Sequence, residues 1–264
     1  SALTICLLGG ASLQWLLGPL SDRIGRKPVM LAGVLLFIAA CLGILFVNSY
    51  GAFLFFRFLQ GTGICFIGAV GYAAIQESFA EASAIRLTAL MANVALIAPL
   101  IGPLAGAFVL QFLDWHWIFL IVAIIAMFSA FGLAKYMPET SPKVSTPLQA
   151  TQLLSDYLAV VKNRRFMAGA ISIGFTSMPL LAWIALAPII LMQDAGLSTI
   201  AYGYWQMPVF IGLILGNMLL AKVVGSAPIQ RIIELGSIPL ALGLLLGLYL
   251  ILATNHWKWI LASL

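Results

Sequence analysis

Long uninterrupted apolar runs fill most of this chain and restrict the folds that it can adopt. The complete runs cover about 2–20, 28–48, 52–76, 87–113, 115–137, 166–192, 199–224 and 229–253. A ninth run begins near His256. A helix needs about 20 apolar residues to cross the hydrocarbon core of a bilayer, and these runs lack the alternating pattern of a barrel strand. We therefore predict an all-α polytopic membrane protein with about eight full transmembrane helices and the start of a ninth.

The composition indicates that lipid is the solvent for most of the surface. Hydrophobic residues make up 63% of the chain and charged residues 8%, whereas a soluble domain carries about 25% charged residues. The net charge of +5 does not predict a nucleic-acid partner, because the basic residues form no dense patch. The three cysteines lie inside apolar runs without the spacing of a disulfide framework or a metal site, so we expect no metal.

The Lys and Arg residues follow the predicted topology. All of the 13 except Arg57 and Lys258 fall in loops or at span ends that share one side of the membrane, if successive spans alternate in direction. Cytoplasmic loops carry an excess of Lys and Arg. We therefore predict that the basic loops are cytoplasmic.

One long polar stretch, residues 138–165, divides the apolar runs into two groups. It contains prolines and then an amphipathic run around Leu153–Val161, which is typical of a helix lying along a membrane surface. We predict an N-terminal helical bundle (1–137), a cytoplasmic linker (138–165) and the start of a C-terminal bundle (166–264). Both chain ends fall inside apolar runs, so we expect this sequence to be cut from a longer protein.

The loop after the first span has the ordered sequence G-P-L-S-D-R-I-G-R-K, beginning at Gly18. Any short cytoplasmic loop is basic, but this order of glycines and charges is far more specific than a basic cluster. Gly18 would let two helices approach closely. Gly25 would allow a turn with positive φ between them.

The charged residues of this loop have two predicted uses. Asp22 can accept hydrogen bonds from the N-terminus of a neighbouring helix, where the helix dipole favours a carboxylate. Arg23, Arg26 and Lys27 can anchor the turn to anionic lipids of the inner leaflet. Glu77 ends a span on the same side of the membrane. It is either a solvated charge at a helix end or a partner for the arginines of the loop.

Two further motifs lie inside spans. The sequence R-F-L-Q-G-T-G begins at Arg57, and A-P-L-I-G-P-L-A-G begins at Ala98. Together with the opening loop they resemble the major facilitator superfamily, and within it the drug–proton antiporters. Ala98 and Ala105 stand where that family usually has glycine. The resemblance runs through the whole chain and implies an incomplete major facilitator fold, with family helices 2–6, the linker, helices 7–9 and the start of helix 10.

The resemblance implies a function as well as a fold. It implies a secondary active multidrug efflux transporter that exports small lipophilic drugs in exchange for protons by rocker-switch alternating access. Such a protein would lie in the bacterial inner membrane, be monomeric as the full-length chain, and use the proton gradient with no cofactor. The loop residues Gly18, Asp22, Arg23, Gly25 and Arg26 would then gate the cytoplasmic side.

Arg57 is a charge within a span, which costs about 2.5–3.5 kcal/mol on insertion scales. One interpretation is that its side chain reaches to the nearby external surface. The other is that it faces an internal cavity and meets a carboxylate or a substrate. The resemblance implies a role in proton coupling.

The second internal motif places two prolines and two glycines on one helix. Pro99 and Pro103 should bend it, and Gly102 with Gly106 forms a G-x-x-x-G pattern that brings helices together. Ordinary helix packing would explain this spacing equally well. The resemblance favours a hinge that also seals the cavity against proton leak.

A substrate cavity is implied by the resemblance alone. Its apolar, adaptable wall would suit varied lipophilic drugs, although lipid-facing or core packing would explain each residue equally well. The residues implied are Met91, Asn93, Ala95, Leu180, Leu181 and Ile184.

No acidic residue lies deep inside a span of this sequence. Proton antiport needs an embedded group whose pKa is raised by burial, so the proton-carrying residue cannot be named here. No catalytic constellation or phosphate-binding loop occurs in the sequence, so we predict no enzyme and no catalytic residues. Two alternatives stay open: a transporter of a small metabolite or sugar with the same fold, and a membrane subunit that transports nothing.

Overall fold

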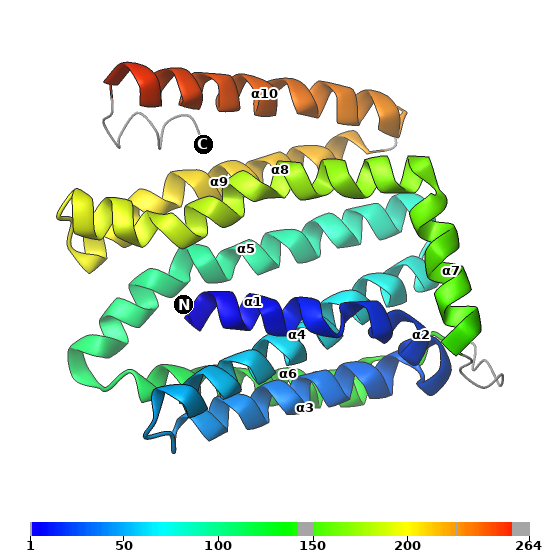
Figure 1. The fold of residues 1–264 in the computed structure, drawn as a ribbon, viewed down its shortest axis with the longest axis horizontal. Coiled ribbons are helices and arrows are strands. Elements are labelled where there is room, and N and C mark those ends of the chain that lie inside the picture. Colours follow the sequence, from blue (N-terminus) through cyan, green and yellow to red (C-terminus); the bar gives the residue numbers. More distant parts are fainter. Residues whose placement is uncertain (1, 142–149, 225, 227, 255–264) are drawn as a thin grey trace. The chain divides into compact units, whose positions relative to one another are not determined.

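The structure is a computed structural model that describes residues 2–141, 150–224, 226 and 228–254. Ten α-helices and one π-helix are assigned in these residues (Figure 1). In chain order they are α1 (Ala2–Ser12), α2 (Gln14–Ile24), α3 (Arg26–Ile44), α4 (Tyr50–Ser78), α5 (Glu81–Phe112), α6 (His116–Tyr136), α7 (Ala150–Lys162), α8 (Arg164–Pro188), η1 (Ile189–Asp194), α9 (Thr199–Val223) and α10 (Ile229–Thr254).

Seven of these helices are long and apolar enough to cross a membrane, and the count is eight if the bent pair α1–α2 forms one span. Each of the eight complete runs in the sequence therefore corresponds to a helix or to a broken helix. The ninth run, near His256, lies outside the described residues. The prediction of an all-α polytopic protein is confirmed.

The first span is broken where the sequence predicted one continuous helix. The axes of α1 and α2 differ by 45°. The hydroxyl of Ser12 donates to the carbonyl of Gly9 at 2.8 Å, and the Thr62 hydroxyl reaches the same carbonyl from α4 at 3.3 Å. Glycine together with a serine that bonds back to the preceding turn is a common cause of helix kinks.

Contacts between Cα atoms divide the chain into two units. Unit 1 consists of Ser1–Ala84 and Phe108–Pro147, and unit 2 consists of Ile85–Ala107 and Leu148–Leu264. The middle of α5 therefore groups with the later helices, although it falls inside the predicted N-terminal bundle of residues 1–137. The division into two bundles with a linker at 138–165 stays a prediction.

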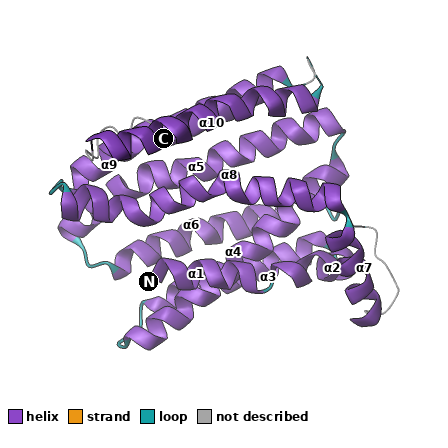
Figure 2. Ribbon diagram, turned by 45° about the horizontal axis from the view of Figure 1, so that its top comes forward, coloured by secondary structure: helices purple, strands orange, loops and turns teal. Residues whose placement is uncertain are grey.

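Within unit 1, α4 packs against both α1 and α3, and α3 packs against α6 (Figure 2). Glycines allow the first two contacts. A Cβ atom on Gly61 would lie 3.0 Å from the backbone nitrogen of Gly10 on α1. A Cβ atom on Gly63 would lie 2.8 Å from the carbonyl oxygen of Gly33 on α3. Small residues at such crossings let helices pack closely in membranes.

The cores of the two units are small. In unit 1, one buried cluster comprises Leu17, Val29, Met30, Cys65 and Val70. In unit 2, the buried cluster comprises Trp183, Ala187, Leu191 and Val209. Most large apolar side chains of α10 are exposed, as expected for a helix whose solvent is lipid.

Candidate functional site

The predicted gating loop is a single-residue turn between α2 and α3. Gly25 has a φ of 110°, which confirms the predicted positive-φ turn, and its N–H donates to the carbonyl of Ser21 at 3.0 Å. A Cβ atom at Gly25 would also come within 2.8 Å of Cδ of Glu139. Glycine is therefore required here for its backbone conformation and for the space that it leaves.

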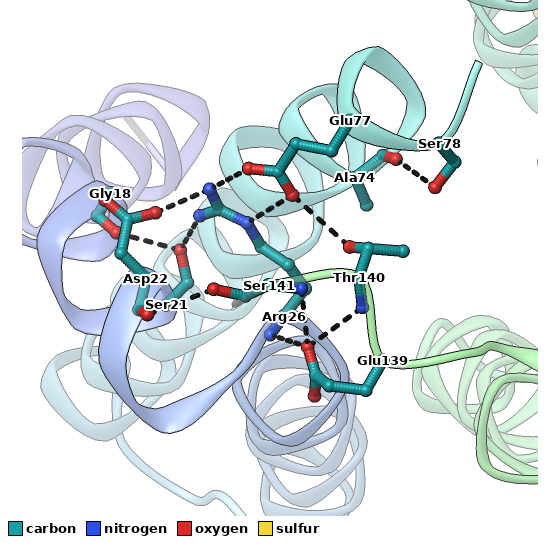
Figure 3. A network of polar contacts seen from close by, with 10 residues as sticks. All are labelled: Gly18, Ser21, Asp22, Arg26, Ala74, Glu77, Ser78, Glu139, Thr140 and Ser141. Carbon is teal, nitrogen blue, oxygen red and sulfur yellow. Dashed lines mark hydrogen bonds and ion pairs between the residues drawn. The ribbon is translucent and has the colours of Figure 1, made fainter. Parts of the chain in front are cut away.

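Arg26 is the centre of a polar network where the end of α2, the start of α3 and the end of α4 meet (Figure 3). It is buried, with 6% of its surface exposed. Its Nη2 atom lies 2.6 Å from Oε1 of Glu77 and 2.5 Å from Oδ1 of Asp22. Its Nε donates to Oε2 of Glu77 at 3.1 Å, and its Nη1 donates to the Ser21 hydroxyl.

This geometry decides between the two interpretations of Glu77. The carboxylate takes both hydrogen bonds of a two-point contact with Arg26, the arrangement that suits the planar guanidinium group. Glu77 is therefore a partner of the loop arginine, and α4 is joined through it to α2 and α3.

The loop residue Asp22 contacts the guanidinium of Arg26, four residues further along the chain. Its predicted contact with the N-terminus of a neighbouring helix stays a prediction. The backbone donors at the start of α3 are instead bound by Glu139, which follows α6. Glu139 accepts from the N–H of Arg26 at 2.7 Å and from the N–H of Lys27 at 3.3 Å.

Glu139 also binds the backbone of its own segment. The N–H groups of Thr140 and Ser141 donate to its Oε1 at 3.1 and 3.2 Å. Burial opposes ionisation of Glu139, but the four backbone donors from Arg26, Ser141, Lys27 and Thr140 outweigh burial and lower the pKa of its carboxyl below the ordinary value. The carboxylate is therefore ionised and held at the positive end of α3.

Two hydroxyls complete the attachment of this segment. Thr140 donates from Oγ1 to Oε2 of Glu77 at 3.3 Å, and Ser141 donates from Oγ to the carbonyl of Asp22 at 3.0 Å. We call this set of seven residues the Arg26 network: Ser21, Asp22, Arg26, Glu77, Glu139, Thr140 and Ser141. It joins the start of the predicted linker to the ends of three helices.

Two other predicted loop residues lie at its edge. Gly18 was predicted to allow close helix packing; among the described residues no neighbouring helix lies within 4 Å of the position of a Cβ atom, and the close packing stays a prediction. The carbonyl of Gly18 accepts from the Ser21 hydroxyl at 2.9 Å. Arg23 is half-buried in the last turn of α2.

Arg57 is half-buried on α4. Its Nη1 donates to Oε1 of Gln60 at 2.7 Å, and its Cζ lies 5.8 Å from the centre of the Phe119 ring on α6. Gln60 is buried and donates in turn to Sγ of Cys41 on α3 at 2.9 Å. Among the described residues, Arg57 thus contacts an amide and an aromatic ring, and its role in proton coupling stays a prediction.

The predicted hinge residues lie in an unbroken helix. Pro99 and Pro103 are both inside α5. No atom of the described residues lies within 4 Å of a Cβ position at Gly102 or Gly106, so the close contact predicted from the G-x-x-x-G pattern is not observed. Gly61 and Gly63, in the motif that begins at Arg57, do sit at close helix crossings.

The predicted cavity residues come from two helices, α5 and α8. Met91 and Ala95 are exposed, and Asn93 is half-buried with an Oδ1 atom that has no hydrogen-bond partner among the described residues. On α8, Leu181 is exposed and Ile184 is half-buried.

Leu180 packs against the Trp183 cluster. In that cluster the indole N–H of Trp183 donates to Oε1 of Gln206 at 2.6 Å. The lining of a substrate cavity by the six predicted residues stays a prediction.

The long apolar helices, with ionic contacts at their ends, define a multi-pass helical membrane protein. The whole chain, residues 1–264, matches the Major Facilitator Superfamily. This protein belongs to that family.

Similar proteins support this assignment. The chain is 51% identical over 265 residues to proteins called "Multidrug transporter MdfA" from Edwardsiella ictaluri (strain 93-146) and from Escherichia coli O157:H7, covering 100% of this chain and 65% of each relative. The chain therefore spans about two thirds of the length of these relatives. Its fold also resembles the crystal structure of the human organic anion transporter MFSD10 (TETRAN), with a TM-score of 0.66 and 18% identity over 99% of this chain and 67% of that one.

Proposed function

We propose that this chain is part of a secondary active transporter that exports small lipophilic drugs across the bacterial inner membrane in exchange for protons. The observation that carries the proposal is the identity of 51% to transporters named for multidrug transport, sustained along the whole chain. The proton gradient supplies the energy without a cofactor. The full-length protein acts as a monomer with its basic loops in the cytoplasm.

The transport cycle in this proposal is alternating access. The bundles predicted at 1–137 and 166–264 rock about a central site and are connected by the linker at 138–165. The Arg26 network holds the ends of α2, α3 and α4 together with the first residues of that linker. It therefore makes the cytoplasmic end of the first bundle stiff, so that the bundle moves as one body and the linker moves with it.

The central site has separate parts for protons and drugs in this proposal. Arg57 supplies a permanent positive charge, and its attraction to a nearby group changes when that group is protonated. The contacts of Arg57 with Gln60 and Phe119 orient the guanidinium. The unpaired amide oxygen of Asn93 is available to a polar group of the drug. The apolar lining comes from Met91, Ala95, Leu180, Leu181 and Ile184, and the segment from Pro99 to Gly106 acts as the hinge.

The test is drug flux in liposomes that contain the full-length protein. A proton gradient imposed without ATP should drive a fluorescent lipophilic drug against its own gradient, and reversal of the proton gradient should reverse the flux. A protonophore is the control that collapses the gradient. Flux of the same size with and without the gradient would reject proton coupling, and coupled flux of a sugar but of no drug would reject the substrate class.

A further inference from the structure

Helix α7 has two chemically different faces. Leu154, Leu158 and Val161 recur at helical spacing on one face and are 62%, 49% and 59% exposed. At 3.6 residues per turn, Asp156 lies on the opposite face and Ser155 lies on the polar flank, and both are also exposed. Three large apolar side chains in a row are thus not covered by the described part of the chain, on a helix too short to span a bilayer.

A single residue sets the direction of α7. The N–H of Asn163 donates to the carbonyls of Ala159 and Val160 at 3.2 and 3.1 Å, which ends α7. Its Oδ1 accepts from the N–H groups of Arg165 and Phe166 at 3.1 and 3.2 Å, which caps the start of α8. The two helices therefore meet at a fixed corner, and α7 runs across the direction of α8 (Figure 1).

This corner has a consequence in a membrane. Helix α8 is long and apolar enough to span the bilayer. Because α7 runs across the end of this spanning helix, α7 must lie along the membrane surface. The apolar face of α7 can enter the boundary of the acyl chains while its polar face stays in water.

Three cations lie at the same corner. Lys162, Arg164 and Arg165 are all exposed, and no described carboxylate lies within 4.0 Å of them. The two arginines occupy the first turn of α8, where the helix dipole disfavours positive charge. An anion bound at this corner would relieve that repulsion and pair with all three side chains.

We propose that α7 and this corner form a binding surface for the anionic phospholipid leaflet. Leu154, Leu158 and Val161 insert among the acyl chains, and Lys162, Arg164 and Arg165 bind lipid phosphates. A protein partner would also cover an apolar stripe, but the row of cations beside the stripe, at the level where a spanning helix leaves the bilayer, matches a charged leaflet. The inference does not depend on what the protein transports.

The first test measures how deeply the apolar face of α7 lies in the membrane. The full-length protein is freed of its native thiols, Cys6, Cys41 and Cys65 among them, by substitution with serine. It is then spin-labelled at Leu158→Cys or, as the matched control, at Ser155→Cys. In phosphatidylcholine–phosphatidylglycerol liposomes, the label at residue 158 should collide more with oxygen than with a water-soluble nickel chelate. The label at residue 155 should show the opposite preference.

Two results would overturn the proposal. A label at residue 158 that prefers the nickel chelate would place the apolar face in water. A label shielded from both reagents would place a protein on it. If the thiol-free protein does not fold, Leu158→Trp and Ser155→Trp are each compared with the native protein. Bromolipids should quench the fluorescence added by the tryptophan at 158 and not that added by the tryptophan at 155.

The second test concerns the cations. Removing phosphatidylglycerol should move the label at residue 158 toward the aqueous phase. The triple variant Lys162→Gln, Arg164→Gln, Arg165→Gln should lose this dependence on anionic lipid, whereas the control Arg231→Gln should keep it. A triple variant with unchanged dependence would reject the assignment of the phosphates to these three side chains.

Discussion

The backbone N–H of Arg26 donates to Oε1 of Glu139 at 2.7 Å and so joins two positions that are 113 residues apart. Through this contact the segment that follows α6 binds the start of α3, directly after the turn between α2 and α3. The same arginine binds Glu77 through its side chain. Its main chain and its side chain therefore hold two different parts of unit 1.

Replacing Glu139 by alanine should destabilise the protein by about 1–2 kcal/mol, because the first donors of α3 lose their acceptor. Glu139→Gln should cost less, since it keeps one carbonyl oxygen. Thermal unfolding in detergent measures both. The control is Asp156→Ala, an exposed carboxylate with no helix terminus to bind, and equal unfolding temperatures for it and Glu139→Ala would contradict the cap.

The same residue predicts a dependence of stability on pH. The pKa of Glu139 is lowered in the folded protein from its ordinary value of 4.5, so the unfolded chain binds its proton first as the pH falls. The contribution of Glu139 is therefore complete above pH 4.5 and is lost as the pH falls through the lower pKa of the folded state. The unfolding temperature of wild type should converge on that of Glu139→Gln in acid, and a constant difference between them would exclude this linkage.

The two acidic partners of Arg26 should not contribute equally to the stability of the folded protein. The side chain of Glu77 is 32% exposed and makes a two-point contact, whereas that of Asp22 is 49% exposed. A double-mutant cycle of Arg26→Met with Glu77→Gln should give a coupling free energy of about 1–3 kcal/mol. The cycle with Asp22→Asn should give less, because a more exposed pair is weaker. A larger coupling with Asp22 would reverse this assignment.

Arg57 should be sensitive to shape as well as to charge. Arg57→Lys keeps the charge but loses the planar group that contacts Gln60 and Phe119. It should lower proton-driven drug flux roughly tenfold, the equivalent of about 1.4 kcal/mol, and Arg57→Ala should abolish coupled flux. The measurement is flux in liposomes, normalised to the amount of inserted protein, with Lys135→Ala as the control. Normal coupled flux in Arg57→Ala would remove this residue from the mechanism.

The glycines give a matched pair of substitutions. Gly63→Ala should destabilise the protein by about 1–3 kcal/mol through overpacking, because its Cβ atom would meet the carbonyl of Gly33 at 2.8 Å. Gly102→Ala should be neutral or stabilise by up to about 1 kcal/mol, since its Cβ position has no neighbour within 4 Å. Thermal unfolding compares the two variants.

The transport assay then separates packing from movement. If Gly102 belongs to a hinge, Gly102→Ala should slow drug flux without lowering the unfolding temperature. Unaltered flux in this stable variant would argue against the hinge at this position.

The helices could be predicted from the sequence because each span is fixed by its own length of apolar residues. The turn at Gly25 could be predicted for the same reason, since one residue and its neighbours decide it. The kink after Ser12 was missed, although Gly9, Gly10 and Ser12 carried a local signal for it.

The contacts of the candidate site were harder to predict. Asp22 and Glu139 are both carboxylates near the start of α3, and nothing local shows that the distant one binds the backbone donors. In the sequence, Pro138 and the polar residues after Glu139 are typical of a linker. Their attachment depends on where α6 ends relative to α2 and α3, which is a property of tertiary packing. The partners of Arg57 depend in the same way on the packing of α4 against α6.

The space above Gly25 limits the mutations that this protein can accept. A side chain at residue 25 would need a strained backbone at φ 110° and would displace the carboxylate of Glu139 from the start of α3. One nucleotide change there would remove the turn and the attachment of the linker together. Shortening the neighbour by Glu139→Asp would restore the room but not the backbone conformation. Revertants of such a mutant should therefore regain glycine itself, and suppressors at a second site should be rare.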